Sequence, residues 1–186
     1  MRKLIGVVGQ MGSGKSAVCT ILRQNGATVI DADDVNRNLA FDVDYLNKIA
    51  EICPEAVEDR KIDYPTLRSW AFADPEHLQA LEKVAQPMIR DRILDMTVGV
   101  PLAFVELSVY REGFLPLDEV WVVTADEQKR LSRVALRNPD WAFEDITRAF
   151  DAQRNMRFPH GAKVIFNNGG RRQLEEQVVK LYRETV

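Results

Sequence analysis

Residues 9–16 combine glycine, lysine and serine at a spacing suited to phosphate chemistry. They read Gly-Gln-Met-Gly-Ser-Gly-Lys-Ser and match the pattern G-x-x-x-x-G-K-[ST] at every fixed position. The glycines allow backbone dihedrals that a side chain would forbid, so successive N–H groups can turn toward one anion. Lys15 can then reach the β- and γ-phosphates of a nucleotide, and the Ser16 hydroxyl can bind Mg²⁺. The stretch therefore predicts a site for ATP and Mg²⁺.

The residues on either side of this loop indicate the elements that must position it. Residues 3–8 form a short apolar run, typical of a buried parallel strand, and residues 16–23 carry apolar side chains at helical spacing. The first turn of such a helix adds unpaired N–H groups and the positive end of the helix dipole. We therefore expect the nucleotide to contact the loop and the start of the helix, namely Gly9, Gln10, Met11, Gly12, Ser13, Gly14, Lys15, Ser16 and Ala17.

Two acidic residues follow other apolar runs. Asp33 comes after a predicted strand at residues 27–30, and Glu106 lies near the end of another at residues 101–107. Ligands of α/β sheets bind at the carboxyl ends of the strands. Asp33 is therefore the candidate general base, although it could instead cap a helix predicted for residues 35–52. Glu106 could reach Mg²⁺ or its water shell, or it could be an ordinary charge at a strand exit.

Basic residues cluster further along, after a predicted strand at residues 119–123. Arg130, Arg133 and Arg137 are spaced by three and four residues, which places them on one face of a helix. Such a stripe could offset the charge of a transferring phosphoryl group, or it could be a solvated face. Arg137 is the catalytic candidate because it lies at the end of the helix, just before an Asn-Pro break.

The remaining pattern predicts an α/β fold of the P-loop NTPase type. A capping-box spacing from Thr124 to Glu127 predicts a helix start, and a second helix follows at about 141–156. Five strand–helix units with right-handed crossovers give a parallel five-stranded sheet covered by helices on both faces. We expect one domain over 1–186, with a core (1–34, 100–125 and 160–186), a helical acceptor-binding insertion (about 35–99) and a helical lid (about 126–159).

Composition excludes several other classes of protein. The chain has 186 residues, 46% of them hydrophobic, and a net charge of −3, without the basic excess of a nucleic-acid binder. Its two cysteines argue against a disulfide framework. No signal-peptide pattern opens the chain and no apolar run approaches a membrane span. We expect a cytoplasmic enzyme whose partners are ATP and a small-molecule substrate.

Several stretches spread along most of the chain carry a resemblance to a known family. They are residues 12–16, 29–33, 67–75, 87–90 and 164–169, together with Arg137 and Gln153. In these stretches the chain resembles the dephospho-CoA kinases. The resemblance implies transfer of the γ-phosphoryl group of ATP to the 3′-hydroxyl of dephospho-CoA, the last step of coenzyme A synthesis.

The resemblance also implies roles for single residues. Asp33 would accept the proton of the acceptor hydroxyl, Lys15 and Ser16 would hold the phosphates and Mg²⁺, and Arg137 would be the lid arginine. Asn167, in the Asn-x-Gly that follows a predicted strand at residues 163–166, is a further expected nucleotide contact.

The chain departs from the usual family pattern at identifiable positions. Gly9-Gln10 stands where the family usually has two glycines, and Tyr64, Gln86, Ser108 and Arg111 differ in segments expected to hold the acceptor. These differences leave open a kinase of another small hydroxyl acceptor, such as a nucleoside or nucleotide. A nucleotide-binding regulator without turnover is a further alternative. The presence of Asp33 and Arg137 argues against it, because a protein that only binds nucleotide has no need of a general base.

Overall fold

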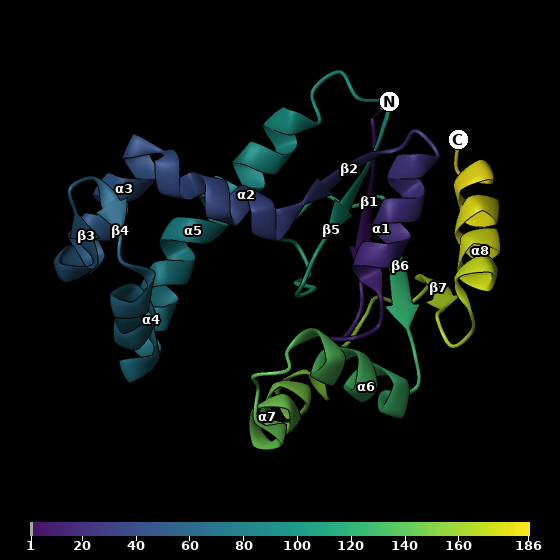
Figure 1. The fold of residues 1–186 in the computed structure, drawn as a ribbon. Coiled ribbons are helices and arrows are strands. Elements are labelled where there is room, and N and C mark those ends of the chain that lie inside the picture. Colours follow the sequence, from purple (N-terminus) through teal and green to yellow (C-terminus); the bar gives the residue numbers. More distant parts are fainter. Residues whose placement is uncertain (1) are drawn as a thin grey trace. The chain divides into compact units, whose positions relative to one another are not determined.

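A computed structural model describes residues 2–186, which fall into two compact units (Figure 1). The first unit contains the residues up to Asp31 together with Gly99–Val186, and the second is Ala32–Val98. The second unit spans nearly the same residues as the helical insertion predicted at about 35–99. The assignment of core, acceptor-binding insertion and lid within one domain stays a prediction.

The first unit is built on a five-stranded sheet in which every neighbouring pair is parallel. Its order is β2-β5-β1-β6-β7, which confirms the predicted parallel five-stranded sheet. β1 lies at the centre and is buried along nearly its whole length, which explains its continuous apolar sequence. The strands are β1 (Lys3–Val8), β2 (Thr28–Asp31), β5 (Leu102–Glu106), β6 (Glu119–Thr124) and β7 (Lys163–Phe166).

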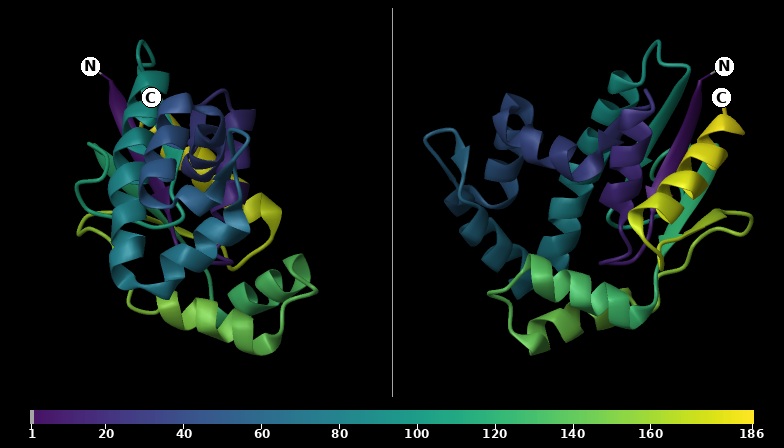
Figure 2. Two further views of the ribbon diagram at one scale, coloured as in Figure 1. Left: turned by 90° about the vertical axis from the view of Figure 1, so that its left-hand side faces the viewer. Right: turned by 45° about the vertical axis from the view of Figure 1, so that its right-hand side comes forward.

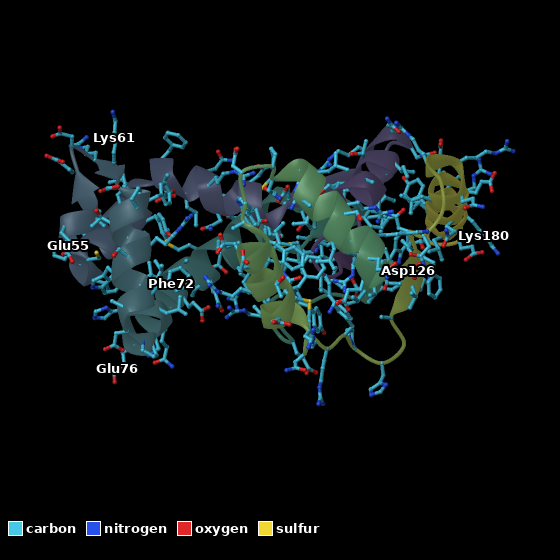
Figure 3. All side chains as sticks on the ribbon, turned by 60° about the horizontal axis from the view of Figure 1, so that its bottom comes forward. Glu55, Lys61, Phe72, Glu76, Asp126 and Lys180 are labelled. Atoms are coloured by element: carbon cyan, nitrogen blue, oxygen red, sulfur yellow. The ribbon has the colours of Figure 1, made fainter. Side chains whose placement is uncertain are left out.

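Two helices of the first unit pack side by side on one face of this sheet, α1 (Lys15–Gln24) and α8 (Arg171–Arg183) (Figures 1 and 2). Beneath them lies a core in which Phe104 meets Trp121 edge-on, with ring centroids 5.0 Å apart. The opposite side of α8 is charged, and Lys180 is among its exposed residues (Figure 3). This packing holds α1 against the sheet that contains β1. Both ends of the loop that joins β1 to α1 are therefore fixed.

Two more helices, α6 (Glu127–Arg137) and α7 (Phe143–Gln153), lie beyond the carboxyl end of β1 (Figure 2). They pack on each other through Val134, Ile146 and Phe150, with Met11 of the loop against this cluster. The predicted capping box was wrong. Thr124 is still paired in the sheet, opposite Phe166, so the residue before α6 is Asp126.

The second unit is mainly helical around its own apolar cluster. A continuous helix over residues 35–52 was wrong, because Asp42 starts a new helix by accepting hydrogen bonds from Asp44 N and Tyr45 N. Asp74 caps α5, and its side chain accepts a hydrogen bond from Glu76 N at 2.8 Å. The elements are α2 (Ala32–Asn38), η1 (Leu39–Phe41), α3 (Val43–Ile52), η2 (Pro54–Ala56), β3 (Val57–Glu58), β4 (Lys61–Ile62), α4 (Tyr64–Ala73) and α5 (Pro75–Met96).

Membrane-spanning helices were not expected from the sequence. Among residues 2–186, no helix combines the length and the apolar character that crossing a bilayer requires.

Candidate functional site

The loop between β1 and α1 takes a conformation that depends on its glycines. Gly12 has φ +76°, and a Cβ there would lie 2.5 Å from the carbonyl oxygen of Arg130 in α6. Gly14 has φ +98° and precedes the first residue of α1, with the Asn167 side-chain amide so close that a Cβ would overlap it. The glycine spacing of the motif is therefore required both by left-handed dihedrals and by the close approach of two neighbouring segments.

Lys15 is the first residue of α1 and turns back across the loop. Its Nζ donates a hydrogen bond to the carbonyl oxygen of Gly9 at 2.7 Å, so the ammonium group lies over the loop. The first N–H groups of a helix have no acceptor within that helix, and the helix dipole adds partial positive charge there. A lysine and a helix N-terminus at one place are features typical of an anion-binding site.

Ser16 and Glu106 come together beside the loop. The Ser16 hydroxyl donates to Glu106 Oε1 at 2.7 Å, and Glu106 is opposite Asp31 in the β2–β5 register. Burial raises the pKa of the neighbouring Cys19 thiol, and the carboxylate of Glu106 raises it further. Cys19 is therefore a protonated, fully buried neighbour of Glu106 rather than a reactive thiolate.

This serine–carboxylate pair fits a magnesium ion. Residues 2–186 contain no cluster of three or more His, Cys, Asp or Glu side chains arranged to bind a metal. Mg²⁺ bound with nucleotides needs no such cluster, because it takes one or two protein oxygens and completes its shell with phosphate oxygens and water. A hydroxyl and a carboxylate oxygen 2.7 Å apart, beside a phosphate-binding loop, supply that kind of donor set.

The outward-facing carbonyl groups of the loop also have partners, and Arg133 is the central one. Its guanidinium donates to the carbonyl oxygens of Gly12 at 3.2 Å, Ser13 at 3.4 Å and Asn167 at 2.8 Å. The Asn167 side chain donates to Ser13 O at 2.8 Å, which places this predicted nucleotide contact directly against the loop.

Arg130 is held in the same region but in a different way. It is buried, lies over the Phe150 ring at 5.0 Å and is 3.5 Å from the carbonyl oxygen of Met11. The arginine stripe is thus not simply a solvated face. The spacing of the arginines was visible in the sequence, but their contacts with loop carbonyls depend on how α6 approaches the loop.

A glutamine at the end of α7 also contacts the loop. Gln153 Oε1 accepts a hydrogen bond from Met11 N at 2.6 Å, and the carbonyl oxygen of Gln153 accepts one from Gln10 Nε2 at 2.9 Å. Sequence reasoning noted Gln153 only as part of a resemblance and gave it no contact. Its pairing with residues about 140 positions earlier has no local signal in the sequence.

The two remaining catalytic candidates lie elsewhere on the chain. Asp33 is an exposed residue in the first turn of α2, two residues after the end of β2, so it is not the N-cap residue that the alternative interpretation required. Arg137 is the exposed last residue of α6. Their catalytic roles stay predictions.

The helical unit carries a surface hollow of about 690 Å³ on α4. Tyr64, Arg68 and Phe72 line it at intervals of four residues, and Phe72 is 73% exposed (Figure 3). Two aromatic rings and a guanidinium on one face offer stacking and charge pairing, which are the contacts that an anionic nucleotide can use.

Comparison with protein families gives a match to one family over nearly the whole chain. The model of the family described as dephospho-CoA kinase matches residues 3–173. The chain belongs to the dephospho-CoA kinase family. Membership agrees with the resemblance seen in residues 12–16, 29–33 and 164–169.

Individual dephospho-CoA kinases are similar to the chain along most of their length. The enzyme of Geobacter sulfurreducens is 32% identical over 96% of both chains, and that of Streptococcus agalactiae is 28% identical over 96% of this chain and 97% of its own. A crystal structure of a Thermus thermophilus protein superposes with a TM-score of 0.81 at 27% identity, covering 100% of this chain and 98% of its own. The dephospho-CoA kinase from Campylobacter jejuni has the same fold, with a TM-score of 0.71 at 21% identity, covering 100% of this chain and 98% of its own.

The protein is therefore a kinase of this family, with ATP as phosphoryl donor and dephospho-CoA as acceptor in coenzyme A biosynthesis. The two alternatives, a kinase of another hydroxyl acceptor and a regulator without turnover, are not favoured by these matches.

Proposed function

We propose that this dephospho-CoA kinase holds ATP on residues 9–17 and uses Asp33 to take the proton from the 3′-hydroxyl of the acceptor ribose. The observation that carries the proposal is the arrangement around the loop, where Lys15 lies across Gly9 and Ser16 meets Glu106. A lysine, a metal-binding oxygen pair and backbone amides at one sheet edge are the parts that phosphoryl transfer needs, since that reaction depends mostly on positioning and charge neutralisation.

Lys15 and the loop amides would bind the β- and γ-phosphates. In the structure the Lys15 ammonium donates to the Gly9 carbonyl, and it can exchange that acceptor for a phosphate oxygen without leaving the loop. Asn167 and Arg133 hold the carbonyls of Ser13 and Gly12 by hydrogen bonds, so that the amides at the end of the loop and the start of α1 can point to the anion. The positive charge of Lys15 favours a triphosphate over an uncharged ligand.

Ser16 and Glu106 would hold Mg²⁺, which when bound neutralises part of the charge on the β- and γ-phosphates. The role of these residues is to present two oxygen atoms at a fixed place beside the phosphates. Glu106 is buried and held by a strand, so its carboxylate has little freedom to leave that place.

Asp33 and Arg137 would act on the transferred group. As the acceptor oxygen forms its bond to the γ-phosphorus, the bond from that phosphorus to the β–γ bridging oxygen breaks and ADP leaves. The proton of the acceptor hydroxyl passes to the Asp33 carboxylate. Arg137 offsets the negative charge spread over the phosphoryl oxygens.

The helical unit, Ala32–Val98, would bind the rest of the acceptor. Support comes from the hollow on α4, where Arg68 can pair with the pyrophosphate of dephospho-CoA and Tyr64 or Phe72 can stack on its base.

Replacing Asp33 tests the proposed general base. Asp33→Asn keeps the size of the side chain but cannot accept the proton, so turnover of ATP with dephospho-CoA should fall by roughly 10²- to 10⁴-fold. The affinity for ATP, measured by calorimetry without acceptor, should stay close to that of the unchanged protein.

Asp34→Asn is the matched control because Asp34 lies in the same helical turn and pairs with Arg37 on the surface. A surface ion pair contributes little, about 1 kcal/mol at most, so this variant should retain its turnover. Near-normal turnover in Asp33→Asn would remove Asp33 from the role of base.

A further inference from the structure

The first half of the phosphate loop is tied to the end of α7 by two hydrogen bonds through different atoms. The main-chain N–H of Met11 donates to the side chain of Gln153 at 2.6 Å, and the side chain of Gln10 donates to the main chain of Gln153 at 2.9 Å. The loop donates both bonds and Gln153 accepts both, one through its side-chain oxygen and one through its main-chain oxygen. Together they fix both the position and the tilt of the Gln10–Met11 peptide.

This contact differs from those that hold the rest of the loop. The second half is fixed by left-handed glycines, by the start of α1 and by the donors Arg133 and Asn167. Residues 10 and 11 carry side chains in place of glycine, and Ser13 N closes a turn onto Gln10 O at 3.1 Å. The orientation of the Gln10 carbonyl therefore affects the position of the Ser13 amide, where the loop turns toward α1.

Hydrogen bonding, not burial of apolar surface, explains the position of Gln153. Its side chain is half-buried, and its neighbours Ala152 and Arg154 are exposed at the end of α7.

We propose that Gln153 is a positioning residue for ATP: it fixes the Gln10–Met11 peptide so that the later loop amides converge on the phosphates. The inference rests on the proposed nucleotide site and extends it to α7. It couples the α6–α7 segment to nucleotide binding, because any displacement of the end of α7 must break both bonds or carry the first half of the loop with it.

Gln153→Met tests the proposal because methionine keeps the length of the side chain and removes the acceptor for Met11 N. Loss of one net hydrogen bond should raise the Kd for ATP about 5- to 10-fold. Hydrogen exchange of the peptide covering residues 9–14 should become faster, since the Met11 amide loses its acceptor. The KM for dephospho-CoA and the melting temperature should change little.

The matched control is Gln128→Met, an exposed glutamine on α6. It should leave ATP affinity, loop exchange and turnover at the level of the unchanged protein. If Gln153→Met fails to fold, Gln10→Met breaks the other hydrogen bond from the loop side and leaves α7 untouched, with the same expected rise in the Kd for ATP.

Two outcomes would overturn the inference. One is a Kd for ATP within twofold of the unchanged protein in both variants. The other is a lower melting temperature and a smaller active fraction with unchanged Kd and unchanged loop exchange, which is the signature of a purely structural residue. Because ATP binding is measured without acceptor, failure here is distinct from failure of the proposed function, which would show as no ATP binding, or no acceptor-dependent turnover, in the unchanged protein.

Discussion

Ser16 and Glu106 are 90 positions apart in the sequence and share a hydrogen bond of 2.7 Å. Two separate arguments predicted them as magnesium ligands, one from the loop motif and one from an acid near the end of a strand. The parallel sheet explains their meeting, because β1 and β5 are neighbours and their carboxyl ends share one edge. Magnesium binding by this pair stays a prediction that a single substitution can test.

Ser16→Ala removes the hydroxyl and leaves α1 otherwise unchanged. The Mg²⁺ concentration needed for half-maximal turnover should rise about 10-fold, the lower end of what loss of a metal-site partner costs. Titration of Mg²⁺ at saturating ATP measures this, with Ser132→Ala, an exposed serine of α6, as control. An identical Mg²⁺ dependence in Ser16→Ala and the unchanged protein would contradict the role.

The sequence identified the residues whose chemistry the motif defines. It also contained Arg133 and Gln153 as residues of interest, but it did not show that they hold the loop in place. Lys15, Ser16 and Glu106 could be found because spacing and strand position are local. Arg133 and Gln153 contact the loop across about 120 and 140 residues, and their acceptors or donors are main-chain atoms. Main-chain atoms are present at every position, so no residue type marks them in the sequence.

At the scale of the elements, the first residues of β1, β6 and β7 are charged and form ion pairs with one another. Glu119 at the start of β6 pairs with Lys163 of β7 at 2.9 Å and with Lys3 of β1 at 3.4 Å. Burial alone would raise the pKa of Glu119. Hydrogen bonds from Lys163 and Trp121, with the charges of Lys163 and Lys3, outweigh burial and lower the pKa below 4.5.

The lowered pKa predicts a pH-dependent contribution to stability. An acid whose pKa is lower in the folded state stabilises the fold above its unfolded pKa, here 4.5, and loses that contribution as the pH falls through the folded value. The melting temperature of the unchanged protein should therefore exceed that of Glu119→Gln at neutral pH, and the difference should shrink below about pH 4.5.

Thermal unfolding between neutral pH and about pH 3 measures this difference. Glu175→Gln, an exposed acid on α8, should show no such dependence. A Glu119→Gln difference that stays constant over the whole range would contradict the assignment.

Element boundaries were less predictable than the elements themselves. The helix predicted over residues 35–52 is divided at Asp42, whose carboxylate accepts two main-chain N–H bonds. The hairpin of β3 and β4 was missed because its strands have two residues each and its turn places Asp59 and Arg60, not glycines, at positive φ. Apolar periodicity indicates where a helix or strand exists, but a short capping side chain or turn decides where it ends.

For the molecule as a whole, the alternation of strands and helices predicted a parallel sheet with the loop at its edge, and the structure confirms that sheet. The order β2-β5-β1-β6-β7 was not predicted, because each crossover can place the next strand on either side of the existing ones. The central place of β1 accounts for the position of the phosphate loop, since a central strand has a neighbour on each side whose carboxyl end can supply a functional residue.

The central claim is transfer of the γ-phosphoryl group of ATP to the 3′-hydroxyl of dephospho-CoA, and phosphorus NMR of the reaction tests it most directly. With ATP, Mg²⁺ and dephospho-CoA, the account predicts ADP and an equal amount of a new phosphomonoester whose phosphorus couples to the ribose 3′ proton. Consumption of ATP without that resonance, or its absence with dephospho-CoA while another hydroxyl acceptor is phosphorylated, would contradict the account.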